Sequence, residues 1–373
     1  MYRELFPLFN TLIKEFNLKG KLSEVRCVST GNINDTYVIT TLFEGGERSY
    51  LVQRVNHNVF CNPERIAENV CKVTDHIESK LRKAGVMDIR RRVLRYYRKP
   101  NGRFYHITEE GNYWRVLSYV YSSVNSSLTD IPHLRSAGLA FGEFQQFLAD
   151  FPSEELYETI PDFHNTKKRL DTLFAHVEED PCDRVESVKT EIEYIASVRE
   201  KAAELSVMFA NGEIPKRVTH NDTKCNNVLF NKKTKEPIVV IDLDTIMPGM
   251  SMYDFADAVR FIANTSVEDE PDISKVFFDT GKFRAFAKGF IGATHTSLEP
   301  VEISNLVKAA FSITIELASR FLDDYITGDK YFKCRYPKHN LVRTRCQLEL
   351  AKDIERKWEE LEWIVRDVIE KLN

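Results

Sequence analysis

Two segments separated by a short turn carry the side chains best suited to chemistry, VTHNDTKCNNVLF (218–230) and VVIDLDTIMPG (239–249). In the first, Asn227 follows Asp222 by five positions, and in the second Asp242 follows an apolar, β-branched run typical of a buried strand. A carboxylate and an amide oxygen on one loop, with a second carboxylate at the end of the next strand, can point into one cleft. This combination of residue types and spacing is typical of sites that transfer a phosphoryl group to a hydroxyl.

Each of these residues then has an expected role. Asp222 is the predicted base that orients the acceptor hydroxyl, and Lys224 is the nearest cation available to the transferring phosphate. Asn227 and Asp242 are the predicted ligands of Mg²⁺, a hard cation that prefers oxygen and needs only one or two protein groups. Asp244 is interpreted either as a second magnesium contact or as a structural acid, with the metal contact favoured.

Three residues close to this group are expected to have structural rather than catalytic roles. His220 is expected to hold the loop backbone rather than to act on substrate. The segment SMYD (251–254) resembles a capping box, so Asp254 is expected to fix a helix start and the neighbouring catalytic loop. Cys225 is interpreted as a packed thiol, because no local pattern supports a nucleophile.

A phosphoryl-transfer site also needs a turn that covers the nucleotide phosphates, and STGNINDTY (29–37) stands at the right place between two expected strands. Gly31, Asn32, Asn34 and Thr36 are its candidate nucleotide-binding residues, because backbone amides in such a turn can face phosphate oxygens. An ordinary β-turn is the alternative interpretation.

The next expected strand supplies further candidates. Leu51 and Gln53 share one of its faces because side chains alternate along a strand, so Leu51 can cover an adenine while Gln53 stands where kinases usually place a phosphate-pairing lysine. Gln53 offers hydrogen bonds but no charge, and Arg54 should point to the opposite face. Tyr119, near the end of a strand expected over 113–121, is a further candidate nucleotide contact.

Hydrophobic periodicity and turn residues predict two lobes, residues 1–121 and residues 122–373, divided at the polar stretch SSVNSSLTD. The first lobe should be rich in strands and should bind the nucleotide, and the second should be mainly helical and carry the catalytic and substrate-binding residues. The expected fold class is therefore α+β. The expected helices are 5–16, 63–83, 134–148 and a closing helix from 348, and the expected strands include 22–28, 49–55, 93–97, 103–108 and 113–121. A tight hairpin turn is expected at Glu44–Glu47, because adjacent glycines reach positive φ freely.

The amino-acid composition limits the classes of binding partner. The 373 residues carry a formal charge of −4, and 43% of them are hydrophobic, so no basic footprint for nucleic acid is present. No apolar run is long enough to cross a bilayer. The seven cysteines form no CxxC pair, which disfavours a disulfide framework or a zinc knuckle. We expect a soluble cytoplasmic protein with small-molecule partners, and the oligomeric state stays open.

Several longer motifs add a resemblance. The segments around Asp222 and Asp242 look like the aminoglycoside phosphotransferase family, which has the bilobal protein-kinase-like fold. The likeness is closer to bacterial N-acetylhexosamine 1-kinases, and the segments that carry it, in chain order, are GNINDTY, WRV, FGEFQQFL, VTHNDTKCNN, IDLDTIMPG, RFLDDYITGD and YPKHNLVRTR. That branch is similar also in having the glutamine that stands here at position 53.

The resemblance implies ATP- and Mg²⁺-dependent phosphorylation of the anomeric (C1) hydroxyl of N-acetylglucosamine or N-acetylgalactosamine. It also implies that Thr245, Phe261, Arg320 and Tyr331 line the sugar pocket. Core packing for Phe261 and a local ion pair for Arg320 are the ordinary alternatives. Three other functions stay open: a kinase of the same fold acting on another sugar or small alcohol, a nucleotide-binding pseudokinase, and a metal-dependent hydrolase.

Overall fold

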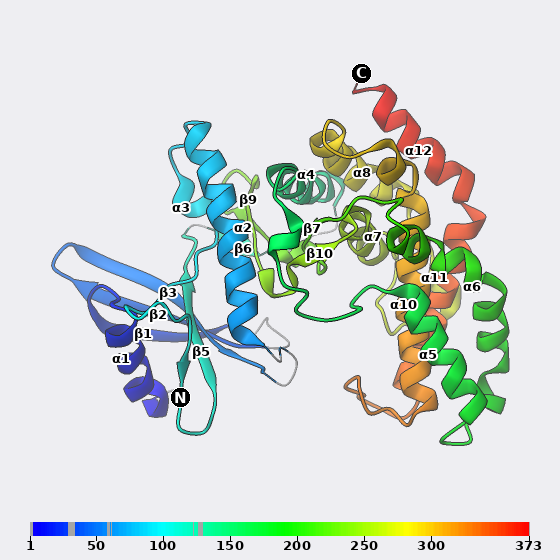
Figure 1. Ribbon diagram of the computed structural model, residues 1–373, viewed down its shortest axis with the longest axis horizontal. Coiled ribbons are helices and arrows are strands. Elements are labelled where there is room, and N and C mark those ends of the chain that lie inside the picture. Colours follow the sequence, from blue (N-terminus) through cyan, green and yellow to red (C-terminus); the bar gives the residue numbers. More distant parts are fainter. Residues whose placement is uncertain are drawn as a thin grey trace.

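The computed structural model describes residues 3–28, 34–57, 60, 62–121, 123–125 and 130–372. A β-sheet at the N-terminal end and a mainly helical C-terminal part stand side by side (Figure 1), which confirms the predicted α+β class with two lobes. We call the elements from η1 (Arg3–Leu5) to β5 (Tyr113–Ser118) the N-terminal lobe and those from β6 (Ser123–Asn125) to α12 (Trp358–Glu370) the C-terminal lobe. The predicted division at residue 121 is close to the passage from β5 to β6 and stays a prediction.

The sheet of the N-terminal lobe has the strand order β1-β2-β3-β5-β4, and every neighbouring pair is antiparallel. The tight turn predicted at Glu44–Glu47 joins β2 to β3, where Phe43 pairs with Gly46 and Gly46 adopts a φ of 126°. The elements of this lobe are η1 (Arg3–Leu5), α1 (Phe6–Glu15), β1 (Lys21–Val28), β2 (Asp35–Phe43), β3 (Gly46–Val55), α2 (Pro63–Lys83), α3 (Ile89–Arg92), β4 (His106–Ile107) and β5 (Tyr113–Ser118).

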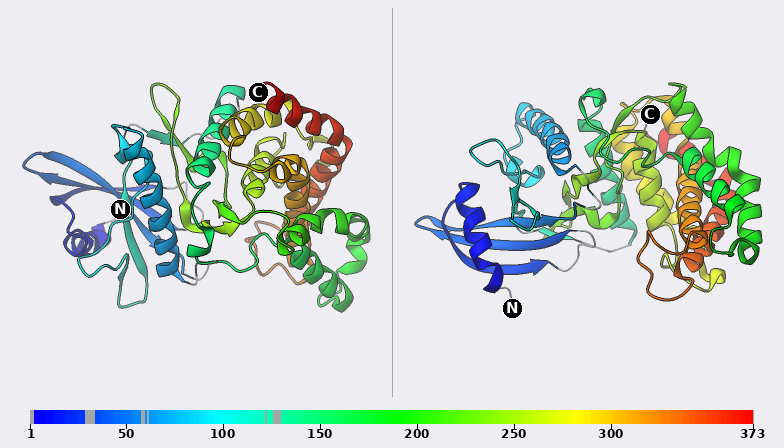
Figure 2. Two further views of the ribbon diagram at one scale, coloured as in Figure 1. Left: turned by 45° about the horizontal axis from the view of Figure 1, so that its top comes forward. Right: turned by 60° about the horizontal axis from the view of Figure 1, so that its bottom comes forward.

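The two faces of this sheet pack against different parts of the molecule. Helix α1 covers one face, where its Phe9 ring lies 6.0 Å from the ring of Trp114. Because side chains alternate along a strand, Arg115 lies on the opposite face, which is turned toward α2 and the C-terminal lobe. The cross-strand partner of Arg115 is Gln53 on β3, and the two side chains share that face. Figure 2 shows α1 and α2 on opposite sides of the sheet.

The C-terminal lobe has a helical core beside two small sheets, β6-β8-β9 and β10-β7. Helices α4 and α8 pack closely at Gly138, which has no side chain. A Cβ atom at this position would lie 2.3 Å from the backbone oxygen of Phe286 and would clash with it. The main elements are β6 (Ser123–Asn125), α4 (Ile131–Phe147), α5 (Thr166–Glu179), α6 (Lys189–Ala210), β7 (Arg217–Thr219), β8 (Val228–Asn231), β9 (Pro237–Val240), β10 (Met247–Gly249), α7 (Ser251–Ile262), α8 (Thr280–Thr294), α9 (Pro300–Ser304), α10 (Leu306–Ile326), α11 (His339–Arg356) and α12 (Trp358–Glu370). Short 3₁₀ turns connect them, η2 (Ser153–Glu155), η3 (Val185–Val188), η4 (Cys225–Asn227), η5 (Leu243–Thr245) and η6 (Ile273–Lys275).

Three predicted elements differ from the structure. The closing helix is two helices, α11 and α12, which meet at Lys357. The strand predicted over 93–97 is reduced to a single bridge between Tyr96 and Leu117, and the one predicted over 103–108 is reduced to β4. In all three places most of the apolar residues are buried, but tertiary packing sets where the regular hydrogen bonding starts and stops. In the described residues, no helix is long and apolar enough to span a membrane.

Candidate active site

The loop between β7 and β8 carries Asp222, and a buried carboxylate holds its backbone. Asp254 on α7 accepts hydrogen bonds from the backbone N–H of His220 at 2.9 Å and of Asn221 at 2.8 Å. Asn221 adopts the left-handed conformation with a φ of 65°. The prediction that Asp254 fixes this loop is confirmed, but the prediction that it caps a helix start is wrong, because the N-cap residue of α7 is Met250.

His220 joins the two halves of the constellation. Its Nδ1 accepts the backbone N–H of Asp222 at 3.2 Å, so its Nε2 carries the proton and donates to the backbone oxygen of Ile241 at 2.9 Å. Ile241 immediately precedes Asp242. The imidazole is buried against the rings of Phe141 and Phe144. These contacts describe the structural role predicted for His220.

Asp222 stands between a cation and an amide. Lys224 Nζ lies 2.9 Å from its Oδ1, and Asn227 Nδ2 donates to its Oδ2 at 3.1 Å and to its backbone oxygen at 2.8 Å. Burial alone would lower the pKa of Lys224, but the adjacent Asp222 carboxylate raises it, so the lysine is held as a cation. Because the amide nitrogen of Asn227 faces Asp222, its amide oxygen is the atom left for a metal ion.

Asp242 follows β9 in the left-handed conformation, with a φ of 62°. The backbone N–H of Ile241 donates to the backbone oxygen of Asn227 at 2.8 Å, which places the two candidate metal ligands on adjoining segments. Desolvation by the surrounding protein and, to a smaller extent, the carboxylates of Asp244 and Asp222 together raise the pKa of Asp242 to about 6, although its side chain still reaches solvent. Such crowding of negative charge favours a bound cation.

The donor set fits magnesium. Asn227 and Asp242 offer an amide oxygen and a carboxylate, which suits a hard cation that takes its other ligands from water and phosphates. Among the described residues, no group of three or more His, Cys, Asp or Glu side chains could hold a metal ion by itself. A metal-dependent hydrolase with two protein-bound ions would need such a group.

Asp244 is buried and accepts four hydrogen bonds. Arg115 donates to both carboxylate oxygens at 2.6 and 2.8 Å, the Tyr96 hydroxyl donates at 2.9 Å, and Asn34 Nδ2 donates at 3.1 Å. Burial would raise the pKa of Asp244, but the Arg115 guanidinium and these hydrogen bonds hold it below its usual range. The contacts therefore describe the structural acid that the sequence left open, and a magnesium contact by Asp244 stays a prediction.

The predicted nucleotide-binding residues fall into two groups. Gly31 and Asn32 lie outside the described residues. Leu51 and Gln53 lie on the face of the sheet turned toward the C-terminal lobe, and Arg54 pairs with Asp35 on the other face, as expected.

The remaining nucleotide candidates border the same region. Thr36 Oγ1 accepts a hydrogen bond from Gln53 Nε2 at 3.1 Å. Asn34 contacts Asp244, as described above, and its Oδ1 accepts the backbone N–H of Asn56 at 3.0 Å. The Tyr119 ring stacks edge-on against Tyr121 at a centroid distance of 5.1 Å. Contact of any of these residues with a nucleotide remains a prediction.

The predicted sugar-binding residues lie in two places. Thr245 Oγ1 donates to the backbone oxygen of His220 at 2.6 Å, so this residue adjoins the catalytic loop. Phe261 on α7 is 46% exposed, which argues against the core-packing alternative. Arg320 lies 5.9 Å from the ring of Tyr331, which is 75% exposed. The contacts found in the described residues do not join this last pair to Thr245 or Phe261.

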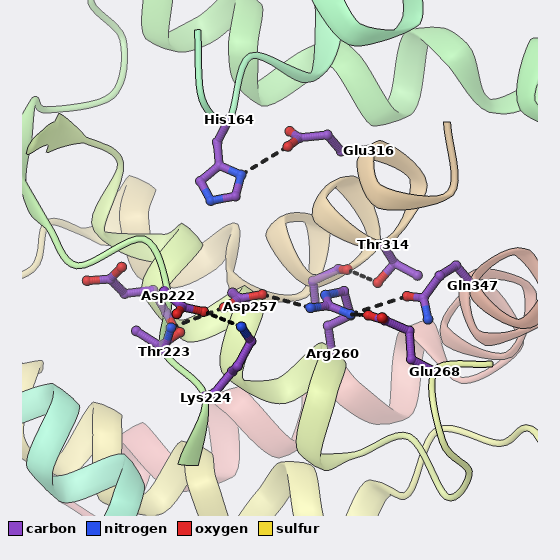
Figure 3. A network of polar contacts seen from close by, with 12 residues as sticks. His164, Asp222, Thr223, Lys224, Asp257, Arg260, Glu268, Thr314, Glu316 and Gln347 are labelled. Carbon is purple, nitrogen blue, oxygen red and sulfur yellow. Dashed lines mark hydrogen bonds and ion pairs between the residues drawn. The ribbon is translucent and has the colours of Figure 1, made fainter. Parts of the chain in front are cut away.

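A buried polar network behind Asp222 was not predicted (Figure 3). Asp257 accepts the backbone N–H of Thr223 at 3.1 Å, and Arg260 Nη2 donates to Asp257 at 2.9 Å. Arg260 also faces Glu268 at 3.5 Å and Gln347 at 3.4 Å. The available signal was an aspartate and an arginine three positions apart within an otherwise apolar helical segment, which places both on one face.

A second unpredicted group stands opposite this network in Figure 3. His164 Nδ1 lies 3.0 Å from Glu316 Oε1, and Thr166 donates to Glu316 Oε2 at 2.8 Å. The Nε2 atom of His164 is buried and has no hydrogen-bond partner in the described part of the chain. The segment around His164 is irregular, so periodicity offered no signal for it.

Comparison with known proteins agrees with this geometry. Residues 24–286, more than half of the chain, match the model of the phosphotransferase enzyme family (APH). The fold is similar to that of a microcompartment-associated aminopropanol kinase, with a TM-score of 0.60, 14% identity and coverage of 95% of this chain and 98% of the other. It is also similar to that of a spectinomycin phosphotransferase solved with ADP and spectinomycin, with a TM-score of 0.57, 10% identity and coverage of 94% and 98%.

An aminoglycoside phosphotransferase from Alicyclobacillus acidocaldarius gives a TM-score of 0.56 at 14% identity, with 92% of each chain covered. At these identities the structures show the fold alone. The family model, however, spans both the sheet of the N-terminal lobe and the segments that carry Asp222, Asn227 and Asp242. The chain belongs to the phosphotransferase enzyme family.

Proposed function

We propose that this protein is an ATP-dependent kinase that phosphorylates the anomeric hydroxyl of an N-acetylhexosamine. The observation that best supports a neutral acceptor is that the acidic side chains near Asp222 already have basic partners. Asp257 and Glu268 face Arg260, and Glu316 faces His164. An amine-bearing acceptor would need an unpaired carboxylate, so a network whose acids already have partners supports a neutral, hydroxyl-rich acceptor.

The transfer chemistry follows from the loop geometry. Asp222, fixed by Asn227 and Lys224, orients the acceptor hydroxyl and accepts its proton, and Lys224 stands ready to face the transferring phosphate. Asn227 and Asp242 would hold Mg²⁺, which neutralises charge on the nucleotide phosphates when bound. The transition state of phosphoryl transfer is loose, so positioning and charge neutralisation are the main contributions of these residues.

ATP as donor is supported by the family and by the ADP bound in the similar spectinomycin phosphotransferase. Use of ATP also favours a cytoplasmic location. The sugar itself is supported by the resemblance in sequence, and by Phe261, whose exposed ring can lie against the apolar face of a pyranose.

Phosphorus NMR of reaction mixtures tests this function. The protein is incubated with ATP, Mg²⁺ and one acceptor at a time: N-acetylglucosamine, N-acetylgalactosamine, their parent hexoses, aminopropanol, ethanolamine, choline and an aminoglycoside. A sugar 1-phosphate signal formed only from the N-acetylated hexoses is the expected result. Turnover of an amine-bearing alcohol in preference to the sugars would contradict the acceptor assignment, and absence of turnover with every acceptor would contradict the proposed activity.

A further inference from the structure

The strand position that normally carries the phosphate-pairing lysine of a kinase holds Gln53, which has no charge. Its Nε2 donates to Thr36 Oγ1 at 3.1 Å, just after the turn expected to cover the phosphates. Charge neutralisation is a main part of phosphoryl-transfer catalysis. A working site therefore needs a cation from elsewhere on this side of the cleft.

Arg115 stands directly across from Gln53. The two residues are partners in the register of β3 and β5, and Arg115 donates from Nε at 3.0 Å and from Nη2 at 2.7 Å to Gln53 Oε1. Residues opposite each other in an antiparallel pair have their Cβ atoms about 5 Å apart on the same face. Strand β5 thus brings a permanent positive charge to the point where β3 lacks one.

An acid orients this arginine. Asp244 receives a bidentate hydrogen bond from Arg115, a geometry that fixes the plane of the guanidinium as well as its position. Asp244 is two residues beyond Asp242, so the ion pair joins the sheet of the N-terminal lobe to the predicted metal-binding segment of the C-terminal lobe. Both partners are 2% exposed.

Burial of this pair is informative because ion pairs seldom stabilise a protein interior more than apolar residues of the same size do. The neighbours of the pair connect it to the nucleotide side of the site. Tyr96 and Asn34 bind Asp244, and Gln53 links Arg115 to Thr36. Arg115 and Asp244 therefore correspond to the lysine and the glutamate of the ion pair in protein kinases. The difference is that the cation lies on β5, the strand adjacent to β3.

We propose that Arg115 supplies the positive charge that positions the nucleotide phosphates, oriented by Asp244 and Gln53. This inference rests on the proposed use of ATP. Arg115 acts as a positioning residue that aligns the phosphates with the metal-binding segment, and Asp222 remains the base.

Relocation of the charge tests this inference. We compare wild type with Arg115→Gln, Gln53→Lys and the double variant that combines them, and we measure the Kd for ADP, the KM for ATP and for the acceptor, and the temperature of unfolding. Arg115→Gln should weaken ADP and raise the KM for ATP by at least about 10-fold, while the KM for the acceptor changes less than about 2-fold. The double variant should recover most of the lost ADP affinity, because lysine at position 53 returns the charge to the same place.

Arg54→Gln is the matched control, because Arg54 is an arginine on the neighbouring position of β3 whose partner Asp35 lies on the other face. It should leave ADP binding unchanged. If Arg115→Gln does not fold, we compare Arg115→Lys, which keeps the positive charge, with Arg115→Met, which removes it. Arg115→Lys should then bind ADP more tightly than Arg115→Met.

The outcomes separate this inference from the proposed function. If wild type binds ADP and Arg115→Gln binds it equally well, or if lysine at position 53 restores nothing, Arg115 is only a structural tie between the lobes and the inference is wrong. If wild type does not bind ADP, the proposed use of ATP itself fails.

Discussion

The acidic side chains on the two sides of the catalytic loop differ in how they are paired with cations. On the nucleotide side, one buried arginine, Arg115, meets one acid, Asp244, and the carboxylate of Asp242 next to them has a raised pKa. On the acceptor side, Arg260 faces two acids and His164 faces a third. In the described residues Asp242 has no cation at ion-pair distance, so a metal ion can serve as its partner, whereas each of the three acids on the acceptor side already faces a basic side chain.

This difference indicates how one loop can serve two unlike substrates. A metal-bound nucleotide carries strong charge and needs a partner for it, while a sugar offers hydroxyls and needs positioned hydrogen-bonding groups. Asp222 stands at the border, paired with Lys224 on the loop and backed by Asp257 through the backbone of Thr223. The following predictions test whether the two sides can be disturbed separately.

The largest effect is expected from Asp222→Asn, because Asp222 is the proposed base that accepts the proton of the acceptor hydroxyl. The kcat should fall by about 10² to 10⁴-fold, the usual contribution of a general base, while the KM for ATP changes little. Steady-state kinetics measure both constants. Asp171→Asn, a change on the exposed surface of α5, is the control and should keep full activity. A comparable loss of ATP binding in Asp222→Asn would contradict the separation of the two sides.

Asp257→Asn should disturb the acceptor side through its network. It leaves the buried guanidinium of Arg260 without its closest acid, so the free energy of unfolding should fall by about 3 kcal/mol. The kcat should fall by about 10-fold because the backbone of Thr223, next to Asp222, loses its charged acceptor.

A double variant sharpens this result. In Asp257→Asn combined with Arg260→Met, the only charge that loses its partner is that of Glu268, whose side chain is 39% exposed and can be hydrated. Much of the unfolding free energy should therefore return while kcat stays low. Chemical denaturation and steady-state kinetics on the same preparations separate the two effects. Recovery of kcat together with stability would show that the network is structural only.

Glu316→Gln should reveal a pH-dependent contribution to stability. Burial alone would raise the pKa of Glu316, but His164 and the hydrogen bonds to it lower the pKa below its usual range. A carboxyl whose pKa is lowered in the folded state stabilises the protein above its unfolded pKa and loses this effect as the pH falls. The variant should therefore be about 1 to 3 kcal/mol less stable than wild type at pH 7.

That difference should shrink below about pH 4.5. Denaturant unfolding of both proteins across pH 2.5 to 8 measures it. A difference that is the same at all pH values would mean that the charge of Glu316 is not what stabilises the network.

The smallest effect is expected from Phe261→Ala. Its ring is 46% exposed, so its removal should barely change the unfolding temperature. Loss of a ring stacked on a sugar should raise the KM for the acceptor by up to about 10-fold, which corresponds to about 0.5 to 1.5 kcal/mol, with the KM for ATP unchanged. An unchanged KM for the acceptor would remove Phe261 from the sugar pocket.

Local sequence determined much of this protein. The helix over 63–83 was predicted with both of its ends, because Pro63 suits the first turn and the apolar spacing runs to the last. The hairpin at 44–47 followed from adjacent glycines, and the spacing of Asp222, Asn227 and Asp242 placed them on neighbouring segments. These features depend on residues that are close in sequence, where geometry is set by a few backbone angles.

Tertiary structure decided the rest. Nothing in the sequence brings Arg115 to Asp244 across 129 positions, or His164 to Glu316 across 152. Those pairs form because the sheet and the helices pack into one arrangement, and burial then makes each charge depend on its partner. Sequence therefore predicted the groups that we propose do the chemistry, while the fold determined which groups pair with their charges, because electrostatic partners are set by distance in space rather than by distance along the chain.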